Sequence, residues 1–543
     1  MTSPLEHTLE LLSSSFNEAA VEVLIAALGQ DDRALVDGAI VALMRRRSKQ
    51  GHLAVIGKLH EFSTDQRQLL RSGRGHINGA IRDAIVSGDN QLFANACELV
   101  EQLSEIDLVP ALIAVAENLK SPHADQATQV VRSLVQQLSN SLRSPSAEPL
   151  RRNPGLMRRH VLENLERCVE RFRQHKRLEL IEAFVILSGP NSNLLRTILR
   201  SPHHACFTPV LQTLNENQSL GVIGLLIEFM QSTKAPHVVT QVVSRRVDDP
   251  FVAEFMAQAD IGFSAKMRRN LQQIEKFAWL DPDSLRPGDR LPPIARKYGR
   301  HAVRMVVAAS LPRETKLKFL ESILQLGSCA SRLAACEALA SIQGDWPNRL
   351  VNEALEDTDP AVQAAAALQM RNRQIPGSLP RLLALLDSAH QTTREAARDA
   401  LQDLSFENYL CRFESLSDEV RRSTGPLVVR VDLQAVPLLL TELSADSRSH
   451  RLRAIEMAEA MALTTQISAA LIERLQDEDH LVRASAASAL QGCSRTDARI
   501  ALQESLQDPS MAVQNAARAS LATMPPLAPL PPLNGNYPME MME

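Results

Sequence analysis

Residues 479–490 read DHLVRASAASAL, and this stretch decides the fold. Similar stretches recur through the C-terminal half of the chain, as SRLAACEAL from Ser331, VQAAAALQM from Val362, TREAARDAL from Thr393 and VQNAARASL from Val513. The first three of these copies begin 31 residues apart. A fixed period of this length predicts a repeat architecture in which each unit is one supersecondary element.

Counted from Val482 in the first stretch and from the first residue quoted for the others, each copy carries a small residue at its fifth position and a large apolar residue at its ninth. The small residues are Ala335, Ala366, Ala397, Ala486 and Ala517, and the large ones are Leu339, Met370, Leu401, Leu490 and Leu521. Four residues make about one helical turn, so both positions fall on one stripe of a helix. Alanine there lets a partner helix approach, and the larger residue fills the layer between repeats.

A turn precedes each of these helices, and a second apolar helix precedes the turn. Asp359 and Asp479 stand where a helix cap is needed, and aspartate can accept hydrogen bonds from the exposed amides of a first turn. Residues 378–386 and 467–475 have the apolar spacing of the upstream helix. Each repeat is therefore predicted to be helix, turn, helix.

The pattern Asp-x-x-Val-Arg-x-x-Ala-x-x-Ala-Leu, complete in residues 479–490, resembles the signature of HEAT repeats. The resemblance extends over roughly residues 311–524. The repeats there are similar in particular to the short bacterial HEAT-like repeats also found in bilin lyases. It implies an all-α fold, an α-α superhelix of the armadillo-like kind in which antiparallel helix pairs stack into a solenoid. A shared fold does not carry an activity with it.

The repeat is regular in only part of the chain. Residues 1–142 contain looser copies, with Asp32 and Asp89 preceding two of them. Residues 143–310 keep helical apolar spacing, but prolines interrupt it and basic residues gather there, so we expect an irregular continuation of the solenoid. The regular array follows over 311–524, and the Pro-rich residues 525–543 are expected to be a disordered tail.

Composition limits the classes of protein that fit. The seven cysteines are scattered without a Cys-x-x-Cys pair, which argues against a disulfide framework or zinc ribbon and favours a reducing cytoplasm. Neither a secretory signal nor a run of eighteen apolar residues is visible, so no membrane span is expected. The sequence predicts no metal site and no cofactor.

Arginine recurs directly after the first apolar position of the repeats, and two interpretations fit it. The column could line a groove for acidic ligands, or it could point inward and pair with turn aspartates as a structural ladder. We favour the ladder, because arginine and aspartate recur together in one motif. Its predicted members are Arg332, Asp359, Arg394, Arg421, Arg453, Asp479 and Arg483.

Two basic windows stand out against a formal net charge of −4, one over residues 143–177 and one over 266–300. They provide the candidate ligand surface: Arg151, Arg152, Arg158, Arg159, Arg268, Arg269, Trp279, Arg296, Lys297, Tyr298 and Arg300. Such a surface could bind nucleic acid or another polyanion, an acidic protein partner, or acidic parts of the same chain. Few aromatic residues and a pI near 6.4 weigh against a dedicated nucleic-acid binder.

No catalytic motif is present among those with a known mechanism, including nucleophile elbows, zinc-protease helices and phosphate-binding loops. The sequence therefore predicts a non-enzymatic scaffold or adaptor that binds a protein partner along its concave surface. A polyanion-binding module is the alternative from a different class. A HEAT-like lyase or DNA-repair enzyme is a third, and no residue outside the shared repeat supports it.

Overall fold

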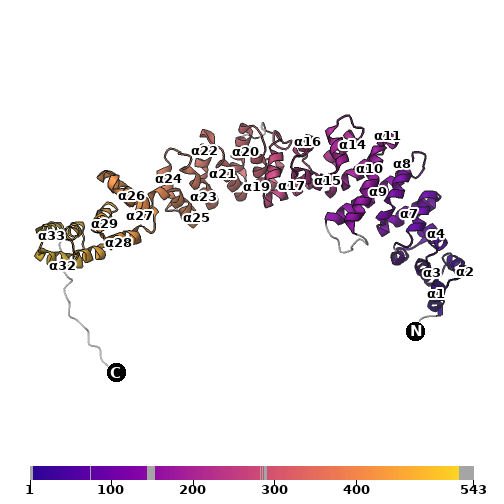
Figure 1. Cartoon of the computed structure of the whole chain (residues 1–543), viewed down its shortest axis with the longest axis horizontal. Coiled ribbons are helices and arrows are strands. Elements are labelled where there is room, and N and C mark those ends of the chain that lie inside the picture. Colours follow the sequence, from indigo (N-terminus) through magenta and orange to yellow (C-terminus); the bar gives the residue numbers. More distant parts are fainter. Residues whose placement is uncertain are drawn as a thin grey trace, which may run out of the picture. The chain divides into compact units, whose positions relative to one another are not determined.

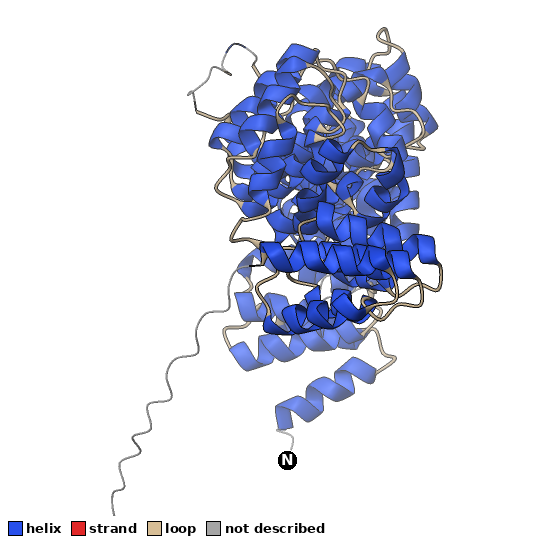
Figure 2. Ribbon diagram, turned by 90° about the vertical axis from the view of Figure 1, so that its left-hand side faces the viewer, coloured by secondary structure: helices blue, strands red, loops and turns tan. Residues whose placement is uncertain are grey.

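The computed structural model describes residues 4–73, 75–143, 153–281, 283, 285 and 290–524, and its helices follow one another in chain order (Figure 1). Arg151, Arg152 and the Pro-rich segment 525–543 lie outside the described residues. The chain divides into two compact units, Met1–Leu326 and Gly327–Glu543. Each unit is an all-α stack, and the described residues contain no strand (Figure 2).

The first unit contains twenty α-helices among its described residues. They are α1 (Pro4–Ser14), α2 (Ala19–Ala27), α3 (Arg33–Arg45), α4 (Lys49–Gly57), α5 (Thr64–Leu69), α6 (Asn78–Ser87), α7 (Asn90–Leu103), α8 (Val109–Glu117), α9 (Ala124–Arg143), α10 (Pro154–Glu170), α11 (Phe172–His175), α12 (Leu178–Leu187), α13 (Asn193–Arg200), α14 (Phe207–Glu216), α15 (Leu220–Met230), α16 (His237–Arg245), α17 (Asp249–Ile261), α18 (Ala265–Leu271), α19 (Pro293–Ala308) and α20 (Arg313–Leu326). The repeat pattern groups α20 with the regular array, whereas its contacts place it in the first unit.

The second unit contains thirteen α-helices among its described residues. They are α21 (Cys329–Leu339), α22 (Asp345–Ala354), α23 (Pro360–Met370), α24 (Ser378–Leu385), α25 (Gln391–Ala400), α26 (Phe406–Arg412), α27 (Asp418–Val431), α28 (Ala435–Leu443), α29 (Arg448–Ala460), α30 (Ser468–Arg474), α31 (His480–Ala489), α32 (Thr496–Glu504) and α33 (Met511–Thr523). Among the described helices of both units, none combines the length and the apolar character that crossing a bilayer requires.

Alternate helices of each unit pack side by side in rows. In the first unit, α7, α9, α12, α15, α17 and α19 form one such row, and α4, α6, α8 and α10 begin the other. In the second unit, α21, α23 and α25 pack in sequence, as do α27, α29, α31 and α33. This arrangement of stacked antiparallel pairs confirms the predicted solenoid fold class.

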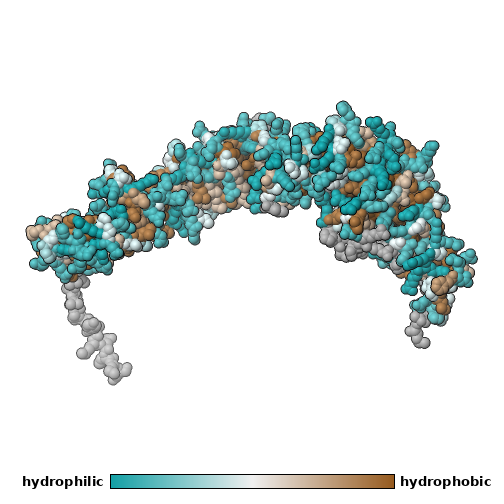
Figure 3. Space-filling view, in the orientation of Figure 1, coloured by the Kyte–Doolittle hydropathy of each residue, from teal (hydrophilic) through white to brown (hydrophobic). Residues whose placement is uncertain are grey.

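The small positions of the repeat lie where the rows meet. Ala335, Ala366, Ala397, Ala486 and Ala517 all have an exposed fraction of 0%. The turn aspartates also do what the sequence predicts, because Asp359 and Asp479 each cap the next helix by accepting two backbone N–H groups. Polar side chains cover most of the face drawn in Figure 3, with apolar residues in small patches between them.

An arginine–aspartate ladder joins consecutive repeats of the second unit. Arg332 donates two hydrogen bonds of 2.8 Å to Asp357, and Arg483 donates bonds of 2.8 and 3.0 Å to Asp508. Each aspartate also accepts the N–H of the residue that caps the following helix, at 2.8 Å for Asp359 and 2.7 Å for Ser510. One carboxylate therefore ties the preceding repeat to the start of the next helix.

The ladder differs from the predicted one in its partners and in one of its arginines. Asp359 and Asp479 are helix caps, and the aspartates two residues before them accept the arginines. In the repeat at α29, Arg451 rather than Arg453 makes the rung, through Asp477 at 2.8 Å. The rung arginine is the fourth residue after the N-cap position, and Ser447 is the N-cap residue of α29, so the position falls on Arg451, two residues before the predicted Arg453.

Three members of the predicted ladder have other partners. Arg453 lies 3.4 Å from Glu442, and Arg394 donates to the carbonyl of Ser388 at 2.7 Å. Arg421 donates to the carbonyl of Phe413 at 2.7 Å, and its guanidinium lies over the Phe413 ring. Within the described residues, the rungs are therefore Arg332–Asp357, Arg451–Asp477 and Arg483–Asp508. No rung starts from α23, α25 or α27 in that part of the chain.

Buried arginines donate hydrogen bonds to carbonyl groups at the carboxyl ends of helices in neighbouring repeats. Arg246 donates to the carbonyls of Leu214 and Asn217 at 3.1 and 3.0 Å, while Asp248 accepts its other N–H groups at 2.7 and 2.6 Å. Arg373, 8% exposed, reaches the carbonyl of Ile342 at 3.0 Å. The last carbonyls of a helix have no partner within it, so these bonds satisfy them and also bind successive repeats together.

Acidification is expected to destabilise the first unit through His52. This residue of α4 is 3% exposed, and its Nε2 has no hydrogen-bond partner among the described residues. Burial lowers the pKa of His52, with the charge of His76 acting in the same direction. The unfolded chain therefore binds this proton at a higher pH than the native state, and stability falls as pH drops below about 6.5.

The measurement is urea unfolding followed by circular dichroism at about pH 7.5 and about pH 5.5, on the two sides of the ordinary histidine pKa. The native chain should lose stability on acidification, and His52→Gln should lose less because it cannot titrate. Equal losses in both proteins would assign the pH dependence to other groups.

Candidate functional site

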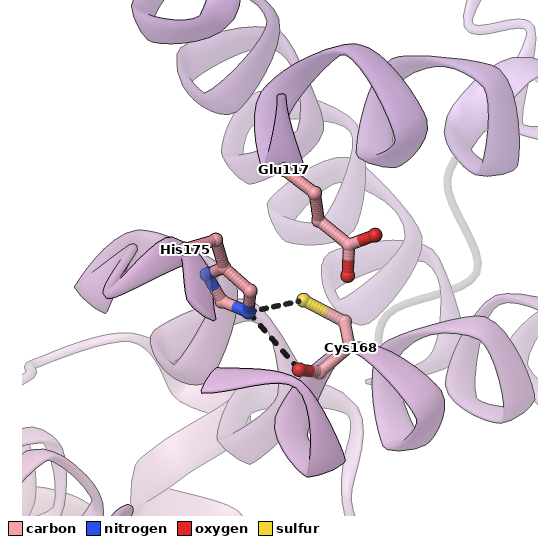
Figure 4. Close-up of side chains that lie close together, drawn as sticks. All are labelled: Glu117, Cys168 and His175. Carbon is pink, nitrogen blue, oxygen red and sulfur yellow. Dashed lines mark hydrogen bonds between the residues drawn. The ribbon is translucent and has the colours of Figure 1, made fainter. Parts of the chain in front are cut away.

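Glu117, Cys168 and His175 form the one group of at least three His, Cys, Asp or Glu residues among the described residues whose ligand atoms all lie within 4.8 Å of one another. They come from the ends of α8, α10 and α11, and the imidazole and thiol face each other (Figure 4). The spacing alone would suit a metal ion. Sequence reasoning did not identify this group, because Glu117 lies 51 residues before Cys168 and no metal-binding motif joins Cys168 to His175.

The hydrogen bonds of this group do not fit a metal site. The backbone N–H of Arg177 donates to Nδ1 of His175 at 3.0 Å, which places the ring proton on Nε2. Nε2 in turn lies 3.0 Å from the carbonyl of Cys168, to which it donates. A metal needs a free Nε2 lone pair and a thiolate, whereas burial raises the pKa of the Cys168 thiol. Glu117 is already paired with Arg171 at 2.8 Å.

The group therefore anchors α11 to α10, and its thiol is expected to be inert. Of the seven cysteines, only Cys329 and Cys411 are exposed, while burial raises the pKa of Cys97 and Cys336 to about 12 and of Cys206 to about 11. Because the thiolate is the reactive form, Ellman's reagent should titrate two thiols rapidly in the native protein and all seven in urea. Rapid reaction of Cys168 in the native state would contradict this assignment.

A basic groove lies in the first unit, between α13, the loop that follows α15, and α18. Its volume is about 1090 Å³. The charged or titratable side chains that line it are Arg196, Arg200, Lys234, His237, Lys266 and Glu228. One carboxylate therefore faces four permanent cations, and the groove is suited to anionic groups.

Three of these cations have no partner to neutralise them. Arg200, Lys234 and Lys266 are exposed, and within the described part of the chain they make no ion pair or hydrogen bond through their side chains. Arg196 donates to the carbonyl of Pro190, which fixes its position and leaves its charge. The single acid, Glu228, lies 3.6 Å from Arg143 outside the groove.

A buried asparagine fixes the loop that carries Lys234. Asn270 of α18 is fully buried and donates to the carbonyls of Met230 and Ser232, at 2.9 Å each. Its side-chain oxygen accepts the N–H of Ala235 at 3.1 Å. Since α18 also carries Lys266, one helix positions cations on two sides of the groove.

Two smaller hollows continue the groove. One, of about 500 Å³, shares Glu228 with it and reaches Arg143 and Arg158. The other, of about 430 Å³, shares His237 and reaches Arg245 and Lys276. Acids accompany these cations, Glu228 and Glu254 in the first hollow and Glu275 in the second, so the excess of positive charge is largest in the central groove.

Comparison with known proteins places the repeats in a family. The sequence pattern of HEAT repeats matches residues 317–402. Residues 317–402 therefore carry HEAT repeats. No curated protein sequence matches it.

Several solved structures align with this chain at low similarity. Kap121p is 13% identical to this chain, with a TM-score of 0.27, and the match covers 96% of this chain and 57% of Kap121p. Kap121p bound to the SUMO protease Ulp1p is 14% identical, with a TM-score of 0.27, and the match covers 96% of this chain and 56% of Kap121p. Importin beta is 12% identical over 95% of this chain and 80% of its own, with a TM-score of 0.24. The chain thus spans little more than half of the length of Kap121p.

The HEAT stack separates the two predicted basic windows. Arg158 and Arg159 lie on α10, and Arg158 donates to the carbonyl of Leu187 at 2.8 Å while Arg159 is exposed. Arg268 and Arg269 lie exposed on α18, where Arg268 donates to the carbonyl of Phe263. Of these four, only Arg158 lines one of the three hollows.

The rest of the second window lies on α19 and the segment before it. Lys297 is 3.5 Å from Asp249 and lies over the Tyr298 ring, and hydrogen bonding to Tyr298 together with Asp249 raises the Lys297 pKa. Trp279 stacks on Phe277, with ring centroids 5.5 Å apart, and is half-buried. Arg296 and Arg300 are exposed.

Sequence reasoning missed most of the groove because its cations are isolated in the chain. Arg196, Arg200 and Lys234 lie between the two basic windows, each far from a charge cluster. Lys266 lies at the edge of the second window and was not singled out. Only the stacking of repeats brings these side chains to one groove, so a count of charge along the sequence cannot find it.

Proposed function

We propose that this HEAT-repeat chain is a non-catalytic cytoplasmic scaffold that binds a protein partner, and that the basic groove of its first unit is a principal contact. The observation that carries the proposal is the convergence of Arg200, Lys234 and Lys266, from three successive parts of the stack, without neutralising partners. Unpaired charges in a preformed groove are a common means of steering and orienting a partner.

The dimensions of the groove favour a polypeptide segment over a small molecule. Small-molecule pockets usually enclose about 300–1,000 Å³ and are mostly apolar. This groove lies at the upper limit of that range, and its lining combines charged residues with Gln231, Ser232 and Thr233, whose polar groups can bond a peptide backbone. Glu228 is its single carboxylate among the described residues, so the paired acids that general acid–base catalysis commonly uses are not supplied there.

Site-specific crosslinking tests the proposal. A photoreactive amino acid replaces Thr233, which is exposed in the groove, or Gln174, which is exposed outside it. We expect a discrete protein to crosslink to the full chain from position 233 and not from 174, and the identified protein, once purified, to bind the chain directly. Equal crosslinking from both positions, or capture of nucleic acid alone, would refute the proposal.

A further inference from the structure

We infer that the basic groove receives an acidic segment of the partner, with glutamate or aspartate side chains bound by Arg200, Lys234 and Lys266. This inference rests on the proposed function and adds the chemistry of the ligand. It concerns the groove of residues 190–273 alone, all of which belong to the first unit.

Charge complementarity identifies the occupant. The groove presents four permanent cations against one acid, although the chain as a whole is acidic with a formal net charge of −4. Arg200, Lys234 and Lys266 make no ion pair with any described residue, so their charges are available to a ligand. Arginine and lysine bind carboxylates through charge-assisted hydrogen bonds, which are stronger than neutral ones.

The fixed loop adds preorganisation to the charge. The three bonds of Asn270 hold residues 230–235 in one conformation before a ligand arrives. A ligand therefore does not have to order the loop, and less of its interaction energy is lost as conformational entropy. Asn270 acts as a positioning residue, because it contacts the loop and does not line the groove.

An acidic peptide fits the lining better than a nucleic acid does. Single-stranded nucleic acids are held by aromatic side chains that stack on bases as well as by cations. No phenylalanine, tyrosine or tryptophan lines the groove among the described residues. The polar groups of Gln231, Ser232 and Thr233 can instead bond the main chain of an extended peptide.

Charge reversal tests the ligand class. The probe is a fluorescein-labelled peptide of alternating glutamate and serine, and its glutamine counterpart serves as the uncharged control. Fluorescence anisotropy is measured on the full chain and on the variant Arg200→Glu, Lys234→Glu, Lys266→Glu. We expect the glutamate peptide to bind, the glutamine peptide not to bind, and the variant to bind at least about tenfold more weakly.

A second variant with the same change of net charge is the matched control. Arg159, Arg167 and Arg173 are exposed on or next to α10, lie outside the groove and make no ion pair with a described residue. Their replacement by glutamate should leave peptide affinity within about twofold, because exposed charges at a distance are screened by salt. An equal loss in both variants would overturn the inference, since net charge alone would then explain binding.

A second pair of variants tests the positioning role without changing charge. Asn95 of α7 is 2% exposed and bonds the carbonyls of Ile56 and Gly57 at 2.8 and 3.0 Å, so it is a structural equivalent of Asn270 away from the groove. Asn270→Ala and Asn95→Ala should both lower the melting temperature. Only Asn270→Ala should lower the affinity for the glutamate peptide, by about threefold to tenfold, because it releases the loop that carries Lys234.

The remaining outcomes separate the inference from the proposed function. Absence of binding to the glutamate peptide at low salt, or tighter binding of single-stranded DNA that the groove variant abolishes, would overturn the acidic-peptide assignment. Crosslinking of a protein from position 233 would then still support the scaffold. Conversely, peptide binding without any protein partner at position 233 would leave the groove chemistry intact and refute the proposed function.

Discussion

Replacement of Gly425 by alanine is expected to destabilise the second unit by about 3 kcal/mol, the upper part of the usual range for overpacking. Gly425 lies within α27, where a Cβ atom would come within 2.4 Å of the carbonyl oxygen of Ala460 and 2.9 Å of the Met461 Cα. These are backbone atoms at the end of α29, so no side-chain rotation relieves the clash. The two helices would have to separate.

Tryptophan fluorescence can follow each unit separately, because the chain contains two tryptophans, Trp279 in the first unit and Trp346 in the second. In a Trp279→Phe background, urea unfolding reported by Trp346 should show the loss. Gly79→Ala in the first unit, followed by Trp279 in a Trp346→Phe background, is the control, since nothing lies within 4 Å of its added Cβ and alanine is favoured over glycine in a helix by about 0.5–1 kcal/mol. A Gly425→Ala variant as stable as its parent would disprove the close approach of α27 and α29.

Replacement of Asp477 by alanine should cost the second unit about 2 kcal/mol, because the buried Arg451 guanidinium then keeps only the exposed Glu478 carboxylate, 3.3 Å away, as an ionic partner. The Asp477 and Arg451 side chains are 3% and 6% exposed and lie 2.8 Å apart. Asp477 also accepts the backbone N–H of Asp479 at 3.0 Å, so the start of α31 loses a bond as well. The same Trp346 unfolding experiment measures the change.

Asp387→Ala provides the comparison for Asp477→Ala. Asp387 pairs with Arg430 at 2.9 Å, but its side chain is 76% exposed, and exposed pairs contribute about 0–1 kcal/mol. If both substitutions had equally small effects, the ladder would not contribute to stability. A larger loss for Asp477→Ala alone would locate the stabilisation in the buried rungs.

The sequence predicts the fold of this protein well, because the information is local and repeated. Alanine at one position, a large apolar residue one turn later and an aspartate before the helix define each unit, and Ala366 and Ala486 are fully buried as expected. The predicted register was wrong at α29, because Arg451 and Arg453 stand two residues apart and each could take the arginine position. Only the cap at Ser447 and the bond from Arg451 to Asp477 resolve it.

The candidate site could not be predicted to the same extent. The groove depends on side chains from α13, the loop after α15, and α18, which are separated by up to 83 positions between Pro190 and Gln273. None belongs to a motif, and their common location is a product of stacking. The fully buried Asn270 that positions the Lys234 loop is likewise indistinguishable in the sequence from an ordinary surface asparagine.

The arginine–aspartate ladder also bears on how such a chain can change in length. Each rung joins residues only 25 or 26 positions apart, as in Arg332 with Asp357 and Arg451 with Asp477. Within α29–α33, duplication or deletion of one whole repeat therefore restores a complete rung at the new junction, whereas a partial repeat leaves an arginine facing the wrong turn. Gene rearrangements in whole repeats should consequently be tolerated, and frame-preserving insertions of other lengths within α29–α33 should not.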